Sequence, residues 1–270
     1  MRTSIPLLPM SGISISSLCE LPTMNAWERS TSFQIGELVA TKGRSLAVFP
    51  IGATEQHGAH LATGTDTFLV ERICREACQR RGVLKLPALP FGCSYGHTEK
   101  WPGTLSLSPI ILTQVLCEIS RWAINGTGID RLFFLSGHAT NGPSIESAIL
   151  QLRYEYPRVR FAYRGLWEIS EKARSIYAVD APDMHANLAE TAMMLAIEPD
   201  GVDMKNAHDF ADVTIGKFWR YAMPAVTPNG VVGRPSEASA AAGAAMLEEI
   251  IQDLEKLLVE AEAEVWPTLP

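Results

Sequence analysis

The sequence lacks an excess of basic residues and lacks any long hydrophobic run. Its 270 residues hold 23 lysines and arginines against 30 aspartates and glutamates, a formal net charge of −7. General nucleic-acid binders show a basic face and anionic membranes attract basic segments, so neither partner is expected. No stretch approaches the roughly 18 apolar residues of a membrane span. Residues 1–17, interrupted by Pro6 and Pro9, show no signal-peptide cleavage pattern, and we expect a structured or frayed extension there.

Cysteine is also scarce and forms no metal or redox motif. The five cysteines are an odd number, and no two of them are spaced as C-x-x-C. Cys74 and Cys78 lie four residues apart in a helical pattern, so we expect them to share a helix face. This usage predicts reduced thiols and a cytoplasmic protein. The other three cysteines are Cys19, Cys93 and Cys117.

The apolar segments that are present alternate between strand-like and helix-like patterns. The strand-like segments are 45–52, 83–92, 130–137 and 158–165. The helix-like segments are 66–82, 108–128, 143–156, 185–198 and 238–265. Such alternation is typical of βαβ units, which form a parallel sheet with helices on both faces. Residues 199–235 are rich in Pro, Gly and Asn and predict long loops, and no linker or repeat divides residues 1–270, which we expect to form one domain.

One segment concentrates side chains of the kinds that bind metals. Residues 49–66 read FPIGATEQHGAHLATGTD and follow an apolar run. Residues two apart in an extended chain point the same way, so Glu55 and His57 can face one site. Asp66 begins the next helix, where a carboxylate is also favoured simply as a helix cap. Carboxylate oxygens and imidazole nitrogens are the usual ligands of catalytic divalent metals, so the segment predicts a metal site.

Two further segments add residues of the same kinds. The sequence FFLSGHATNG (133–142) places His138 after a second buried strand, and parallel sheets bind ligands outside the carboxyl ends of their strands. The sequence HANLAETAMMLA (185–196) places Glu190 on an apolar helix face, where a carboxylate is costly unless it is paired or metal-bound. An ion pair with a buried arginine is the alternative for Glu190. His185 lies five residues earlier, about 140° around a helix, and is expected at the helix entrance.

Together these segments resemble the creatininase (creatinine amidohydrolase) family. PIGATEQHGAHLATGTD is similar to the family pattern P-x-G-s-x-E-Q-H-G-p-H-L-P-l-g-t-D, and WPGTLSLSP (101–109) to F-P-G-T-l-s-l. SGHATNG is similar to N-G-H-G-G-N, and HANLAETAMMLA to H-A-g-x-x-E-T-S-x-M-L. NGVVGRPSEASAAAG (229–243) is similar to G-v-x-G-d-P-x-x-A-s-x-x-x-G. Five ordered motifs are far more specific than any one of them.

The resemblance implies a three-layer α/β/α fold around a mostly parallel sheet. It implies one or two divalent metal ions, usually zinc, iron or manganese, at the carboxyl edge of that sheet. Glu55 and His138 would bind one metal, His57 and Glu190 the other, and Asp66 would bridge them. His185 would be the catalytic histidine near the substrate, and Glu190 is expected to be catalytic as well as a ligand. The resemblance also implies a homo-oligomer, usually a hexamer, that acts on a small molecule.

The sequence departs from the family pattern at several positions. Creatininase itself has a glutamate ligand two residues after the histidine of N-G-H; Thr140 stands there, which argues against creatinine as the substrate but not against the fold. Ser136 replaces the asparagine of N-G-H, and Ala62 the proline after H-L. Arg234 replaces the aspartate of the last motif and can bind an anionic substrate group or form a surface salt bridge.

These residues predict a hydrolase of a non-peptide C–N bond, in a cyclic amide or a formamide. A metal-activated water would attack the carbonyl carbon, and His185 would give a proton to the leaving nitrogen. The alternatives are hydrolysis of a ring C–C bond in a cyclic diketone, a peptidase-like activity, and an inactive metal-binding assembly subunit. His60 would orient a ligand, touch substrate or fill the core. The other candidate substrate contacts are His97, Trp101, Arg234, Trp167 and Trp219, and His208 is not expected to reach the site.

Overall fold

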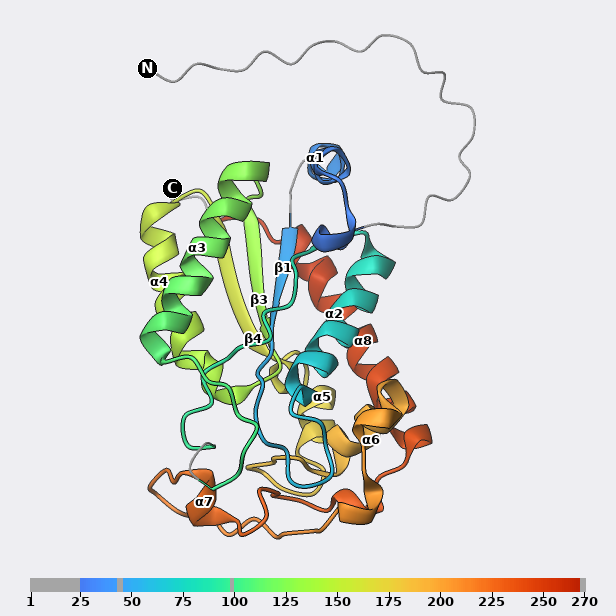
Figure 1. Cartoon of the computed structure of the whole chain (residues 1–270). Helices are drawn as coiled ribbons and strands as arrows, with labels where there is room; N and C mark the ends of the chain where they lie inside the picture. The colour runs from blue at the N-terminus through green and yellow to red at the C-terminus, as the bar shows by residue number, and fades with distance from the viewer. Residues whose placement is uncertain (1–24, 43–45, 98–99, 268–270) are drawn as a thin grey trace.

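The computed structural model describes residues 25–42, 46–97 and 100–267, and its strands form one parallel sheet (Figure 1). In the described residues the strand order is β2-β1-β3-β4, and every pairing is parallel. The strands are β1 (Leu46–Ile51), β2 (Leu84–Lys85), β3 (Arg131–Ser136) and β4 (Arg160–Gly165). Cys19 and the predicted amino-terminal extension over residues 1–17 lie outside the described residues.

Helices cover both faces of this sheet and build two separate apolar cores. One core lies under α1 (Ser32–Lys42), α3 (Pro109–Thr127) and α4 (Gly142–Glu155). The other lies under α2 (Thr65–Arg81), α5 (Glu171–Tyr177), α6 (Leu188–Ile197) and α8 (Ala240–Ala263). The short helix α7 (Met223–Val226) belongs to the loops beyond the carboxyl end of the sheet. The predicted three-layer α/β/α fold is confirmed. In the described part of the chain, none of the helices is long and apolar enough to cross a membrane.

The start and stop signals in the sequence act where they were expected. The Ser108 hydroxyl accepts a hydrogen bond from the Ile111 amide at 3.3 Å, and Pro109 occupies the first turn of α3. Helix α2 ends at Arg81 and is capped by Gly82, whose φ of 62° is left-handed and therefore suits glycine. Cys74 and Cys78 share a face of α2, with their sulfurs 3.8 Å apart and buried.

The strand register brings the carboxyl ends of β1, β3 and β4 into line. Ile51 pairs with Ser136, and Ser136 pairs with Gly165. The loops after β1 and β3 therefore leave the sheet at the same edge. Gly137 permits a close approach there, because a Cβ on it would lie 2.4 Å from the Asp66 carbonyl oxygen. The absence of a side chain at this position lets the end of β3 meet the first turn of α2.

Two predicted elements differ from the structure in their extent. The strand predicted over 83–92 is regular only at Leu84–Lys85, because Pro87 and Pro90 have no amide hydrogen for the ladder. The chain still follows β1, since the Gly52 amide donates to the Leu89 carbonyl at 2.9 Å. The helix predicted from residue 185 begins at Leu188, after Ala186 adopts a left-handed φ of 49°. His185 therefore lies before the helix, as expected of a residue at its entrance.

The packing of α8 on α6 leaves no room for a methyl group at Gly243. A Cβ on Gly243 would lie 1.8 Å from the Ala192 carbonyl oxygen, which belongs to the backbone of α6. We expect Gly243→Ala to lower the free energy of unfolding by about 3 kcal/mol, measured by urea unfolding. Gly126→Ala in α3 is the matched control: nothing lies within 4 Å of its Cβ, so it should stabilise by about 0.5–1 kcal/mol. Equal stabilities for the two variants would contradict the α6–α8 contact.

Candidate metal centre

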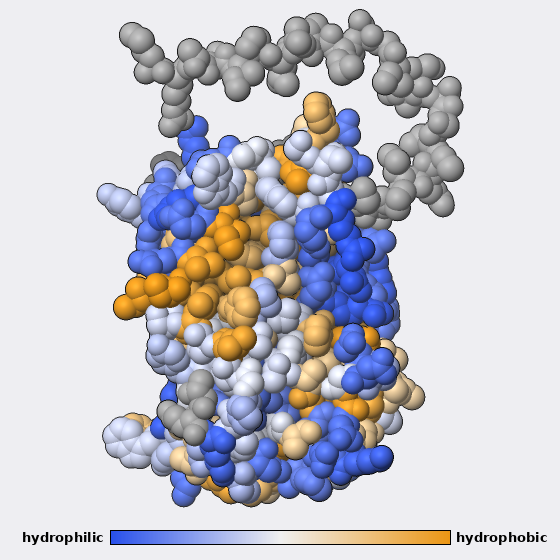
Figure 2. Space-filling model, in the orientation of Figure 1, coloured by the Kyte–Doolittle hydropathy of each residue, from blue (hydrophilic) through white to orange (hydrophobic). Residues whose placement is uncertain are grey.

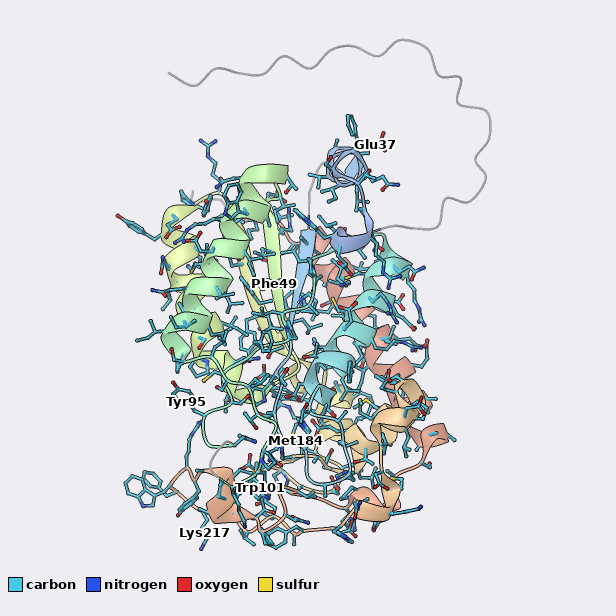
Figure 3. All side chains as sticks on the ribbon, in the orientation of Figure 1. Glu37, Phe49, Tyr95, Trp101, Met184 and Lys217 are labelled. Atoms are coloured by element: carbon cyan, nitrogen blue, oxygen red, sulfur yellow. The ribbon has the colours of Figure 1, made fainter. Side chains whose placement is uncertain are left out.

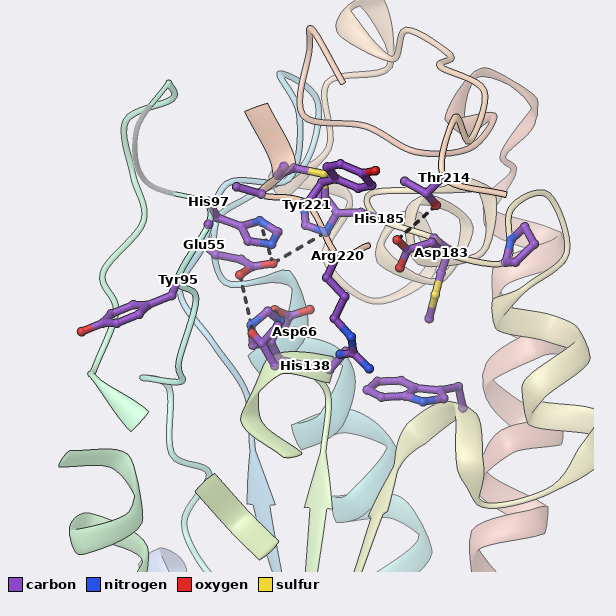
Figure 4. Close-up of a pocket in the computed structure, with 18 of the residues that line it drawn as sticks. Glu55, Asp66, Tyr95, His97, His138, Asp183, His185, Thr214, Arg220 and Tyr221 are labelled. Carbon is purple, nitrogen blue, oxygen red and sulfur yellow. Dashed lines mark hydrogen bonds and ion pairs between the residues drawn. The ribbon is translucent and has the colours of Figure 1, made fainter. Parts of the chain in front are cut away.

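Four of the predicted metal-ligand side chains meet at the carboxyl edge of the sheet, and Figure 4 shows three of them, Glu55, Asp66 and His138. Glu55 and His57 follow β1, Asp66 lies in the first turn of α2, and His138 follows β3. His57 Nε2 is 3.3 Å from Asp66 Oδ1, and His138 Nδ1 is 3.3 Å from Asp66 Oδ2. His138 Nε2 is 3.2 Å from Glu55 Oε2. Asp66 therefore lies between two histidines that come from different strands.

Three histidines of this cluster have one ring nitrogen fixed by a backbone carbonyl. The donors and acceptors are His57 Nδ1 to Glu55 O at 3.1 Å, His138 Nε2 to Cys93 O at 3.0 Å, and His185 Nε2 to Gln56 O at 2.9 Å. A neutral imidazole has one N–H, so the other nitrogen presents a lone pair. For His57 and His138 this nitrogen faces Asp66, and His185 Nδ1 lies 3.6 Å from Glu55 Oε1. Metal-binding histidines are typically oriented in this way.

The buried polar atoms of the cluster lack hydrogen-bond partners. Glu55, Asp66 and Glu190 are 0%, 3% and 6% exposed. The atoms without a partner among the described residues include Glu55 Oε1 and Oε2, His57 Nε2, Asp66 Oδ2 and Glu190 Oε2. Buried carboxylate oxygens without partners are costly, and a bound cation would satisfy them. The residues present therefore fit one or two divalent metal ions.

The electrostatics of the cluster also call for positive charge. Burial opposes protonation of His57, but the charge of Asp66 raises its pKa to about 10. Burial likewise opposes protonation of His138, but Glu55 and Asp66 raise its pKa to about 9. Burial raises the pKa of Glu55 above its usual range. Without a cation, protons would therefore hold the positions between the histidines and the carboxylates.

Glu190 reaches the same region from α6. The side-chain oxygen of Asn187 caps this helix by accepting from the Glu190 amide at 3.1 Å. Glu190 lines the same cavity as Glu55, Asp66 and His138, and burial raises its pKa to about 7. No arginine pairs with Glu190 among the described residues, which excludes the buried ion pair there. Asp66 is not the helix cap either, because Gly64 occupies that position.

His185 and His97 form the upper part of the cluster, around Glu55. His97 Nδ1 lies 3.5 Å from Glu55 Oε1, and the rings of His97 and His185 have centroids 4.8 Å apart. Both Glu55–His57–Asp66 and Glu55–His97–His185 have ligand atoms within 4.8 Å of one another. Burial and the neighbouring histidines lower the pKa of His97 to about 3 and that of His185 well below its usual range. His185 is therefore a neutral imidazole beside the carboxylates.

A cavity of about 710 Å³ opens onto this cluster. Glu55, Asp66, His138, His185 and Glu190 form its floor, and His97 lies at one side. Its outer wall is the loop segment 214–223, and the predicted lining residues Trp167 and Trp219 both line it. Figure 3 shows Tyr95, Met184 and Lys217, which also line the cavity, beyond the carboxyl end of the sheet.

Three predicted substrate contacts do not line this cavity. His60 is buried behind the centre, where its Nε2 pairs with Thr191 Oγ1 at 3.0 Å and burial lowers its pKa to about 4. Trp101 is half-buried beside Lys100, outside the lining residues. Arg234 is on the surface, where its Nε lies 3.5 Å from Glu237 Oε1. It therefore forms the surface salt bridge that was the alternative to binding an anionic substrate group. His208 is exposed and does not line the cavity.

Two residues that position the site were not predicted. Gln56 supplies the carbonyl that contacts His185 Nε2, and its side-chain Nε2 lies 3.0 Å from His185 Nε2 and 3.4 Å from His97 Nδ1. Asn141 is fully buried and joins three segments: its Nδ2 donates to Gly52 O, its Oδ1 accepts from the Cys93 amide at 2.8 Å, and it contacts Ser136 Oγ. Their only sequence signal was their place inside the motifs EQHG and SGHATNG.

The family model for creatininase, described as creatinine amidohydrolase, matches residues 28–258. The chain belongs to the creatininase family. The predicted class, an amidohydrolase of the creatininase type, is confirmed by this membership. The peptidase for the mycofactocin precursor peptide from Mycobacterium ulcerans (strain Agy99) is 30% identical over 220 residues, covering 76% of this chain and 81% of that protein. Creatinine amidohydrolase from Pseudomonas putida is 28% identical over 252 residues, covering 83% and 95%.

Solved creatininase structures share the fold. A crystal structure of creatinine amidohydrolase superimposes with a TM-score of 0.77 at 27% identity, covering 89% of this chain and 98% of that one. A creatininase with manganese superimposes with a TM-score of 0.76 at 26% identity, covering 88% of this chain and 99% of that one. A mutant creatininase of the Zn–Zn type superimposes with a TM-score of 0.76 at 25% identity, covering 89% of this chain and 99% of that one. Zinc and manganese therefore occur in creatininases, and the predicted cofactor class is confirmed for the family.

Proposed function

We propose that this creatininase-family protein hydrolyses a non-peptide C–N bond, in a cyclic amide or a formamide, at a centre of one or two divalent metal ions. The observation that supports it most is the set of three histidines fixed by backbone carbonyls, each with its other nitrogen turned to a buried carboxylate. A site that binds and activates a cation needs this arrangement, and a purely structural cluster does not.

The ligands divide between two metals in the proposed site. Glu55 and His138 would hold one ion, His57 and Glu190 the other, and Asp66, whose two oxygens face different histidines, would bridge them. Bound divalent metals lower the pKa of a water molecule and polarise a substrate carbonyl. The protein side chains fix these positions and keep them buried from bulk solvent.

His185 is the proposed proton carrier. Its Nε2 lies 2.9 Å from the Gln56 carbonyl oxygen and 3.0 Å from the Gln56 side-chain nitrogen. In the tautomer with Nε2–H toward the carbonyl, Nδ1 is the atom that accepts a proton and passes it to the leaving nitrogen. Burial keeps His185 in its neutral form, in which one ring nitrogen carries a free lone pair. His97 lies against it on the cavity side and is the proposed substrate contact.

Thr140 argues against creatinine itself as the substrate. Its hydroxyl donates to the Cys93 carbonyl and contacts His138 Nε2, so it fills the place of the creatininase glutamate without adding a carboxylate. A peptidase-like activity is the second candidate, favoured by the 30% identity to the mycofactocin peptidase. A 3-dehydro-scyllo-inosose hydrolase from Thermotoga maritima (strain MSB8) is 25% identical over 265 residues, covering 88% of this chain and 84% of that protein. This relative supports hydrolysis of a ring compound as a further alternative. An inactive assembly subunit is less well supported, because it has no need of buried carboxylates.

Hydrolysis of a panel of ring amides, formamides, short peptides and cyclic diketones by the metal-loaded protein tests the proposal. In His185→Gln, turnover of the best substrate should fall by about 10²–10⁴-fold while the metal content stays unchanged, because only a proton carrier is removed. The same change at the exposed His208 is the control and should leave both unchanged. Loss of metal in His185→Gln would make it a ligand and contradict the assigned role. Cleavage of peptides or diketones alone would overturn the C–N proposal.

We also propose that the protein self-associates, up to a hexamer, and resides in the cytoplasm as one domain over residues 1–270. The face over α3 and α4 is apolar (Figure 2), and its exposed large side chains are Ile110, Ile111, Trp122, Leu150 and Tyr154. Apolar patches of this kind mark contact surfaces. The described cysteines are free and buried, as expected of reduced thiols. Light scattering of the full chain tests the first proposal, and a monomer at micromolar concentration would contradict it.

A further inference from the structure

The outer wall of the cavity carries two cations without acidic partners. Lys217 and Arg220 both line the cavity, and in Figure 4 the Arg220 side chain extends from this wall toward Asp66 and His138. Among the described residues, neither side chain has a hydrogen bond or an ion pair within the chain. An arginine that reaches into a cavity without a partner is available to a ligand.

The charges around the cavity favour an anionic ligand group near Arg220. Metal ions would compensate Glu55, Asp66 and Glu190, which leaves Asp183 as the one further acid of the lining. Asp183 Oδ2 lies 3.4 Å from the Thr214 hydroxyl, whose shorter hydrogen bond, at 2.6 Å, goes to Asp212 Oδ1. Two basic groups therefore face one acid. The planar guanidinium of arginine matches a carboxylate with two parallel hydrogen bonds.

We propose that the substrate carries a carboxylate, which Arg220 binds while the amide of the same molecule lies at the metal centre. This inference rests on the proposed function, since it names the substrate class of that site. The cavity of about 710 Å³ is of the size that holds a small molecule with both groups. Trp167, which also lines the cavity, offers a planar apolar surface to such a molecule.

Two ring amides that differ only in a carboxylate test the inference. The metal-loaded full chain is titrated by calorimetry with 5-oxoproline and with 2-pyrrolidinone. We expect 5-oxoproline to bind at least about tenfold more tightly. In Arg220→Gln this preference should fall to about twofold or less, because the neutral amide cannot pair with the carboxylate. Arg153→Gln, at an exposed arginine of α4, is the matched control and should keep the preference.

Each other outcome overturns the inference. Equal binding of the two amides by the unaltered protein shows that no group selects the carboxylate, and no binding of either up to about 20 mM excludes the ring-amide carboxylate class. A preference that survives in Arg220→Gln assigns the carboxylate to the metals or to Lys217. Metal analysis of the same samples separates the two proposals. A protein without metal would contradict the hydrolase, whereas a carboxylate preference lost in Arg220→Gln would still support this subsite.

Discussion

Replacing Glu190 with glutamine is expected to remove metal from the centre and to lower turnover by about a thousandfold or more. The side chain is 6% exposed, and its Oε2 has no hydrogen-bond partner among the described residues. Glutamine has the same shape but no charge, so a cation at this position loses a ligand and several kcal/mol of transition-state stabilisation. The metal content per chain is measured by elemental analysis, and turnover with the best substrate of the amide panel.

Glu146→Gln is the control for this change. Glu146 is an exposed glutamate of α4, so the same loss of charge there should leave metal content and turnover unaltered. If Glu190→Gln kept its full metal and full activity, the assignment of Glu190 as a ligand would be wrong. Loss of activity with full metal retention would instead place Glu190 in proton transfer.

Removal of the metal is expected to lower the melting temperature by roughly 8–16 °C. A cation held at a thousandfold above its dissociation constant stabilises the folded state by about 4 kcal/mol, and a chain of this size shifts by roughly 2–4 °C per kcal/mol. The physical source is the set of buried oxygens on Glu55, Asp66 and Glu190, which lose a divalent charge when the cation leaves and regain only the protons that His57 and His138 take up. Calorimetry before and after dialysis against dipicolinate, with elemental analysis of both samples, measures the shift.

Two further samples complete this experiment. Adding back zinc or manganese to the stripped protein should restore the melting temperature. Asp66→Asn, which removes the proposed bridging carboxylate, should show little further change with the chelator. An unchanged melting temperature in a sample proved free of metal would show that the buried carboxylates do not depend on a cation.

The sequence predicted the parts of the site that depend on strand ends. Glu55, His57 and His138 could be placed together because parallel strands deliver their following residues to one edge, and the register of β1 and β3 does so. The ends of α2 and α3 followed from Gly82, Ser108 and Pro109, whose local chemistry acts in any context. The roles of these side chains as ligands stay predictions.

The parts that the sequence could not predict depend on contacts between distant segments. The polar bonds of His60 to Thr191 and of Gln56 to His97 join residues that are 131 and 41 positions apart. The outer wall of the cavity comes from a loop without periodicity, so Lys217 and Arg220 carried no pattern. Helices α1 and α5 were not predicted either, because the residues around them showed no clear alternation with strands.

Asn141 ties the ends of β1 and β3 to the loop at Cys93. Segment 214–223 instead faces the centre across the cavity, and the Met223 amide at its end donates to the Gly96 carbonyl at 3.0 Å. Chemistry and selectivity are therefore encoded in separate stretches of the gene product. Substitutions in segment 214–223 can change which substrates bind while the residues of the centre stay the same. Divergence of such a scaffold toward new substrates should accordingly be concentrated in that stretch.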